Sequence, residues 1–163
     1  MNMKTKWIAV FLIGLLTACA TQQQREERQA RTKAAVAEML AKRHWQIDVT
    51  QMGTLRYGSR MVTPDFFLQL RGDTLCSYLP FLGQAYQAPM ASPPQGLNFE
   101  KTVQNYVESR PKANFTRMEM DVRTQEDTYH YMVEIYDNGK ASISVRSMNR
   151  DPVNFEGDLK IEN

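Results

Sequence analysis

The sequence contains few of the residues from which disulfide frameworks and metal sites are built. Its 163 residues include two cysteines and two histidines. Two cysteines exclude a small scaffold held by several disulfides. The sequence also has no Cys/His cluster, no HExxH motif and no Asp-rich calcium loop. We therefore expect no metal ion and no cofactor.

An excess of charge of one sign is lacking as well. Twenty Lys and Arg face eighteen Asp and Glu, which gives a net charge of +2. This surplus equals Lys4 and Lys6, which lie in a segment that we expect to be removed, and 18 − 18 leaves zero for the remaining chain. A neutral domain has no basic field to attract nucleic acid. We therefore expect no nucleic-acid partner.

Motifs of common enzymes are missing too. The sequence has no Walker loop, no G-x-G-x-x-G and no G-x-S-x-G elbow. We assign no catalytic residue and favour a non-enzymatic role. A hydrolase with paired carboxylates stays open as an alternative, because Glu119, Asp121, Glu126 and Asp127 cluster before a turn and separation in space cannot be read from sequence.

What is present is an export signal. Lys4 and Lys6 precede an uncharged run, Trp7 to Leu16, which is too short to cross about 30 Å of hydrocarbon as a helix but suits a signal peptide. The run ends in Leu16-Thr-Ala-Cys19, which resembles the lipobox of bacterial lipoproteins. We expect residues 1–18 to be a signal peptide and Cys19 to carry the lipid, including palmitate. Two or more acyl chains anchor a protein stably in a membrane.

Residues 19–26 are polar and predict a flexible, lipid-anchored tether. From about Arg25 to Arg43 the composition favours a helix, with an apolar stripe of Val36, Met39 and Leu40 that ends at Arg43. We predict one α+β domain over residues 27–163, in which the helix docks by its second half.

After the helix, apolar and polar residues alternate with period two, which is typical of half-buried strands. An antiparallel sheet with one covered face gives this pattern. The fold class that we predict is therefore α+β, with an N-terminal helix packed on a mainly antiparallel, meander-like β-sheet. Strands are predicted at Trp45–Val49, within 60–71, at Leu75–Phe81, Phe99–Val107, Phe115–Val122, Tyr129–Ile135, Ala141–Val145, Val153–Phe155 and Leu159–Ile161.

Three local features complete the prediction. Asn138-Gly139 favours a type I′ hairpin turn, after which Ala141, Ile143 and Val145 should face inward. Gly72-Asp73 favours a second turn. Once Cys19 is acylated, Cys76 is the remaining thiol, and we expect it to be buried and inert because a free cysteine packs as a small apolar residue.

The segment 83–96 interrupts the alternation. It is rich in proline and glycine, and Pro93 and Pro94 oppose both helix and sheet. Long irregular segments are often functional. We therefore consider Tyr86, Met90, Pro93 and Pro94 a candidate partner-contact loop, with a covering flap as the alternative.

Together these residues resemble the domain of unknown function 4251 of Bacteroidota lipoproteins, over about Glu27 to Ile161. The pattern comprises the lipobox, the Arg/Ala-rich helix, Phe-x-x-Leu-x-Gly-Asp before Leu-Pro-Phe-Leu-Gly83, Tyr131-x-Val-x-Ile, Asn138-Gly139-x-Ala141-x-Ile-x-Val145, Arg150 and Phe155-x-Gly157-x-Leu159. The resemblance implies an envelope lipoprotein with a β-rich domain, and it transfers no activity or site residues. It implies anchoring in the outer membrane, facing the periplasm or the cell surface.

We therefore expect a lipid-anchored, non-enzymatic binding or scaffold domain with a protein or glycan partner in the envelope. Its partner would meet the open sheet face or the loop 83–96. The alternatives are an envelope hydrolase with carboxylates on a sheet face, and a carrier of a small ligand. The carrier requires a cavity between helix and sheet.

Overall fold

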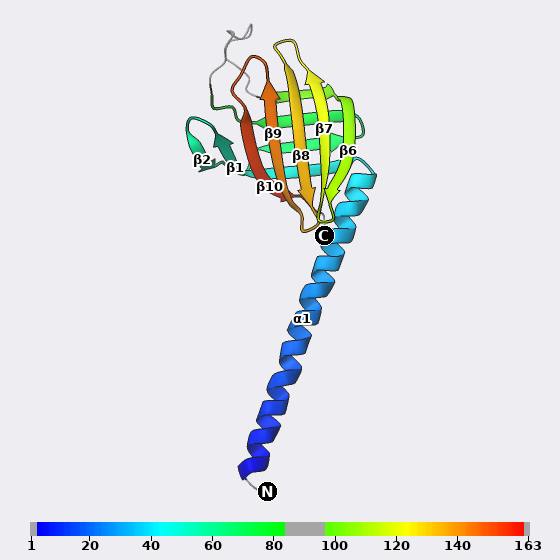
Figure 1. The fold of residues 1–163 in the computed structure, drawn as a ribbon, viewed down its shortest axis with the longest axis vertical. Helices are drawn as coiled ribbons and strands as arrows, with labels where there is room; N and C mark the ends of the chain where they lie inside the picture. Colours follow the sequence, from blue (N-terminus) through cyan, green and yellow to red (C-terminus); the bar gives the residue numbers. More distant parts are fainter. Residues whose placement is uncertain (1–2, 84–96, 162–163) are drawn as a thin grey trace.

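The computed structural model describes residues 3–83 and 97–161 and shows one helix followed by a curled antiparallel sheet (Figure 1). The helix followed by an antiparallel meander confirms the coarse fold prediction. The elements are α1 (Met3–Ala41), β1 (His44–Thr54), β2 (Gly58–Met61), β3 (Phe67–Arg71), β4 (Thr74–Leu79), β5 (Leu97–Thr102), β6 (Gln104–Lys112), β7 (Phe115–Arg123), β8 (Thr128–Tyr136), β9 (Lys140–Ser147) and β10 (Val153–Leu159).

The strand order is β5-β4-β3-β1-β10-β9-β8-β7-β6, with β2 paired to β1 beside this path. The first and last strands therefore meet in the middle of the sheet, where Ile47 pairs with Leu159 in antiparallel register. β5 and β6 stand at opposite ends of the order although one residue, Val103, separates them in the chain. The sheet curls to bring these ends together, and Figure 1 shows β6 to β10 in front of the other half.

The corner between β5 and β6 explains how one predicted strand became two. Phe99–Val107 is extended, as predicted, but bends at Val103, whose amide donates to the Asp73 carbonyl at 2.8 Å. Asn105 follows with a positive φ of 51°. Such bends let a strand pass from one layer of a sheet to the other.

The core lies inside the curl and collects alternate side chains of most strands, whereas β2 and β6 have no buried residue. Ala141, Ile143 and Val145 are buried and Arg146 is exposed, as the alternation predicted. Trp45, Tyr131 and Phe155 are the largest side chains that are almost fully buried. We call the surface that encloses this core the inner face of the sheet and the opposite surface its outer face.

The helix is longer than predicted. α1 runs without interruption from Met3 to Ala41, across the segment for which a flexible tether was predicted. Gln, Arg, Glu and Ala fill residues 22–30, and all four residue types favour helix. Among the described residues, no helix has the length and apolar run needed to cross a membrane.

The end of α1 corrects the predicted apolar stripe. Val36 and Leu40 are buried, and Met39 packs against the core. Arg43 lies outside the helix, because its backbone takes a φ of 48° after Ala41. Its guanidinium is exposed, bonds to Asp73 at 3.2 Å and lies 4.2 Å from the centre of the Tyr106 ring.

Both predicted turns are present, but one has another geometry. Gly72 has a φ of 62° and, with Asp73, joins β3 to β4. A type I′ turn needs positive φ at both Asn138 and Gly139, whereas only Gly139 has it, at 83°. The Gly139 amide donates to the Tyr136 carbonyl at 2.9 Å. This is the geometry of a type I turn followed by a G1 bulge.

Cys76 is half-buried, so the prediction of a buried core thiol is wrong. Its neighbours Leu75 and Ser77 are buried, as is Leu79 of the same strand, and strand alternation places Cys76 on the outer face. The polar Ser77 can face the core because its hydroxyl pairs with the hydroxyl of Tyr131 at 3.1 Å. Sequence alone does not show this pairing.

Candidate functional site

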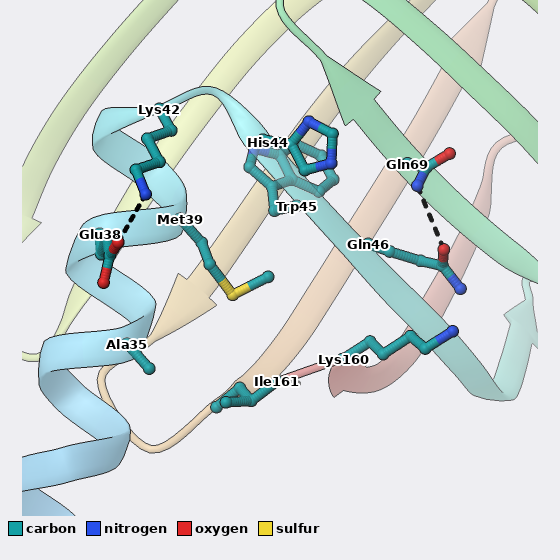
Figure 2. A pocket seen from close by; sticks show the side chains of 10 residues that line it. All are labelled: Ala35, Glu38, Met39, Lys42, His44, Trp45, Gln46, Gln69, Lys160 and Ile161. Atoms are coloured by element: carbon teal, nitrogen blue, oxygen red, sulfur yellow. Dashed lines mark hydrogen bonds and ion pairs between the residues drawn. The ribbon is translucent and has the colours of Figure 1, made fainter. Parts of the chain in front are cut away.

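A groove of about 330 Å³ lies where the end of α1 meets β1 and the segment after β10 (Figure 2). This volume is at the lower end of the range for small-molecule sites. It lies between helix and sheet, where the carrier hypothesis requires a cavity, but it is open and partly polar. Its lining residues are Ala35, Glu38, Met39, Lys42, His44, Trp45, Gln46, Gln69, Lys160 and Ile161.

The floor of the groove is a polar row on three adjacent strands or strand extensions. Gln46 on β1 pairs with Gln69 on β3, and the Gln69 side-chain amide donates to Gln46 Oε1 at 3.3 Å. On the other side of Gln46, its carbonyl accepts from the backbone amide of Lys160 at 2.8 Å. Gln46 Nε2 donates to Asp48 at 2.7 Å, which fixes the orientation of this side chain.

The walls of the groove are apolar. Figure 2 shows the Met39 side chain leaving α1 and pointing into the space above Ile161, with Ala35 one turn earlier on the helix. Trp45, on β1 just after the C-terminal end of α1, is 1% exposed. Its indole nitrogen is buried and has no hydrogen-bond partner within the part of the chain that the structure describes.

Cations outnumber anions around the groove. Lys42 and Glu38 form an exposed ion pair at 2.6 Å, and the hydrogen bond and charge of Lys42 hold the pKa of the Glu38 carboxyl below its ordinary value. Lys160 forms no ion pair among residues 3–83 and 97–161. Two lysines against one lining carboxylate leave a local positive charge.

A second cavity, of about 230 Å³, lies on the outer face of β7 to β9. Glu119, His130, Met132, Ser144 and Arg146 line it. His130 Nδ1 lies 2.8 Å from Asp121 on the neighbouring strand. Hydrogen bonds from Asn105 and then His130 lower the pKa of the Asp121 carboxyl.

The four carboxylates singled out in the sequence separate into two groups. Glu119 and Asp121 share the outer face of β7, because they stand two positions apart on one strand, with the buried Met120 between them. Glu126 instead pairs with the buried Arg150 at 2.7 Å, and Asp127 accepts the backbone amide of Thr128 at 2.8 Å. A general acid needs a raised pKa, and the pKa of Asp121 is shifted in the opposite direction.

The comparisons with known proteins agree on the family. A family model described as "Domain of unknown function (DUF4251)" matches residues 27–159. The chain belongs to the DUF4251 family. This confirms the resemblance drawn from the residue pattern, which spans nearly the same range.

The fold of this DUF4251 chain is similar to a solved relative. It superposes on the crystal structure of a DUF4251 family protein from Bacteroides eggerthii DSM 20697 with a TM-score of 0.59 and 14% identity, covering 80% of this chain and 90% of that chain. At this identity the likeness shows the fold alone. No curated protein matches the chain significantly.

Two residues of the DUF4251 pattern have structural roles. The Arg150 side chain is 6% exposed, bonds to Glu126 and stacks on Phe81, at 5.2 Å from the ring centre. Gly157 on β10 lies against β1, where a Cβ atom would overlap the Asp48 carbonyl oxygen. These positions stabilise the domain rather than form the groove.

The remaining predicted site residues lie elsewhere. Tyr86, Met90, Pro93 and Pro94 lie outside the described residues, and Cys19 lies in the part of α1 whose side chains are not described. Within the described ranges, no group of three or more His, Cys, Asp or Glu is placed to hold a metal ion.

Sequence reasoning missed the groove as a site. Its residues come from three distant segments, 35–46, 69 and 160–161, and their types are common on protein surfaces. Met39 was recognised as part of the helix stripe, but no motif links it to Gln69 or Lys160. Their proximity follows from the pairing of β1 with both β3 and β10.

Proposed function

We propose that this DUF4251 chain is a non-enzymatic binding domain, anchored to the outer membrane by a lipid on Cys19 and facing the periplasm or the cell surface. Its ligand, a protein or glycan component of the envelope, occupies the groove at the C-terminal end of α1. The groove carries this proposal, because it combines an ordered polar floor, apolar walls and a local positive charge at one place.

The anchor is supported by the order of the first nineteen residues. A basic start, a ten-residue apolar run and Leu16-Thr-Ala-Cys19 follow one another as in bacterial lipoproteins. In α1, fourteen positions separate Cys19 from Lys33, which corresponds to about 21 Å of helix at 1.5 Å per residue. Lys33 bonds to Asp137 at 3.0 Å in the β8–β9 turn.

We further propose that the last turns of α1 pack on the sheet as one body with it. The Lys33–Asp137 bond, the burial of Val36 and Leu40 and the position of Met39 against the core support this arrangement. The lipid would then hold the groove at a set distance from the membrane. The helix, rather than a flexible linker, would connect the lipidated Cys19 to the domain.

Metabolic labelling with palmitate in cells tests the anchor. Cys19→Ala should abolish labelling, whereas Cys76→Ala, which removes the other cysteine, should leave it unchanged. Equal labelling of wild type and Cys19→Ala would refute lipidation at this residue.

Site-specific photocrosslinking in intact cells tests the groove. A photoreactive amino acid at His44, an exposed residue that lines the groove without a part in its hydrogen-bonded floor, should give a discrete adduct, which mass spectrometry then identifies. The control is the same amino acid at Glu156, which is exposed on β10 outside the groove. The binding role would be refuted by identical adducts at both positions, or by none at His44.

A further inference from the structure

The groove combines a cationic side, a floor of side-chain amides and an apolar side, and these three surfaces together define a ligand class. We infer that it receives the carboxylate end of a short peptide whose last side chain is apolar. This inference rests on the proposed binding role of the groove and adds the chemistry of the ligand.

The carboxylate is assigned by the charge of the site. Lys160 lines the groove with no ion pair in the described part of the chain, and the Lys42 ammonium keeps donor capacity beside Glu38. Asp48 is the neighbouring acidic residue on β1, but it does not line the groove and its Oδ1 already accepts from Gln46. An anion beside Lys160 therefore meets a cation that has no ion-pair partner among residues 3–83 and 97–161.

The peptide is assigned by the two amides of the floor. Gln46 and Gln69 lie side by side across β1 and β3, joined by one hydrogen bond. Gln69 Oε1 has no partner among the described residues, and side-chain amides pair well with backbone amides because both offer a donor and an acceptor. A simple aliphatic carboxylate has no N–H group to donate to Gln69 Oε1.

The apolar last side chain is assigned by the opposite wall. Met39 points into the groove above Ile161 (Figure 2), and a methionine side chain adapts its shape to varied apolar partners. A volume of about 330 Å³ suits a ligand of one or two residues rather than a long chain. A leucine side chain between Met39 and Ile161 would leave its carboxylate free to face Lys160.

Isothermal titration calorimetry on the full chain in detergent micelles tests this inference with three probes. These are N-acetyl-alanyl-leucine, the same dipeptide with its terminus blocked as an amide, and hexanoate. We expect the acid to bind at least about tenfold more tightly than the amide, as for loss of a charge-assisted hydrogen bond. Hexanoate should bind at least about tenfold more weakly than the acid, because it lacks the peptide amides.

Variants locate the interaction. Lys160→Met should remove most of the preference for the acid over the amide, while Lys101→Met, which changes an exposed lysine on β5 outside the groove, should retain it. Gln69→Leu should lower the affinity for the acid and the affinity for the amide by the same factor. Near-UV circular dichroism of each variant reports whether the fold is intact.

Several results would overturn the inference. Equal affinity for the acid and the amide would refute recognition of the terminal carboxylate. Equal affinity for the acid and hexanoate would refute recognition of the peptide amides. If none of the three probes binds while the crosslink from position 44 forms in cells, the ligand class is wrong and the proposed function stands. Absence of the crosslink from position 44 would instead refute the proposed function.

Discussion

Gly157 provides a test of how closely the last strand must approach the first. A Cβ atom at this position would overlap the Asp48 carbonyl oxygen and lie 3.0 Å from both the Asp48 carbonyl carbon and Val49 Cα. Carbon atoms pack favourably at about 3.5–4.0 Å, so alanine would force β10 and β1 apart by about 0.5 Å or more. This contact lies beside the register shift between Val49 and Gln51, where the pairing of β1 with β10 is already irregular.

The expected cost follows from two effects. Overpacking a well-filled site costs about 1–3 kcal/mol, and each weakened hydrogen bond of the ladder adds up to about 1 kcal/mol. Because the atoms that must move belong to the backbone, we expect Gly157→Ala to lower the free energy of unfolding by about 3 kcal/mol.

Gly53→Ala is the matched control. Gly53 lies on β1 opposite Asn154 of β10, and a Cβ atom there would meet nothing closer than 4.0 Å. Where the backbone tolerates it, Gly→Ala stabilises by about 0.4–1 kcal/mol by restricting the unfolded chain. Both variants lose a glycine, so a difference between their free energies of unfolding reports the steric overlap at position 157.

The assay is urea unfolding followed by Trp45 fluorescence. Trp7→Phe in the background leaves Trp45 as the sole tryptophan, and its burial makes its emission sensitive to the core. The midpoint should fall for Gly157→Ala without a change in the denaturant slope. A difference below about 1 kcal/mol between the two alanine variants would refute the close approach of the strands.

Three further predictions concern buried polar groups. Arg150→Met should cost about 3 kcal/mol or more, because it leaves Glu126 without its partner, whereas Arg146→Met on the exposed face should cost under about 0.5 kcal/mol in the same unfolding assay. Tyr131→Phe and Ser77→Ala should each cost about 1 kcal/mol, and the double variant should cost less than their sum by about 1 kcal/mol; additive costs would refute the bond. Burial raises the pKa of Tyr131, so its contribution to stability is complete below the unfolded value of about 10 and declines as pH rises above it. The urea midpoint should fall at alkaline pH, and less so in Tyr131→Phe.

Most strands were predictable because their residues alternate. β9 shows this well, since Ala141, Ile143 and Val145 are buried and the residues between them are not. Burial of one face is a local property, and each strand therefore records it in its own residues. The hairpin at Gly139 was predictable in place because an Asn-Gly pair favours the positive φ that Gly139 adopts.

Geometry that depends on distant partners was not predictable. The turn at Asn138 differs from the expected type because its backbone angles also depend on the register between β8 and β9. Cys76 was expected inside because cysteine is small and apolar, but Ser77 faces the core with Leu75 and Leu79, and its hydroxyl finds a partner in Tyr131 of β8. Both outcomes depend on a residue on another strand.

The groove was beyond sequence reasoning for a related reason. Gln46, Gln69 and Lys160 meet because β1 pairs with β3 on one side and continues beside the segment after β10 on the other. Nothing in their local sequence distinguishes them from ordinary surface residues. The family resemblance could identify the domain but carries no ligand with it.

The central pairing of β1 with β10 also determines when the molecule can fold during its synthesis. β10 joins two groups of strands, β5-β4-β3-β1 and β9-β8-β7-β6, which have no other shared ladder in the described sheet. A ribosome releases β10 after every other strand of this described sheet, so the nascent chain cannot unite the two halves until β10 has emerged.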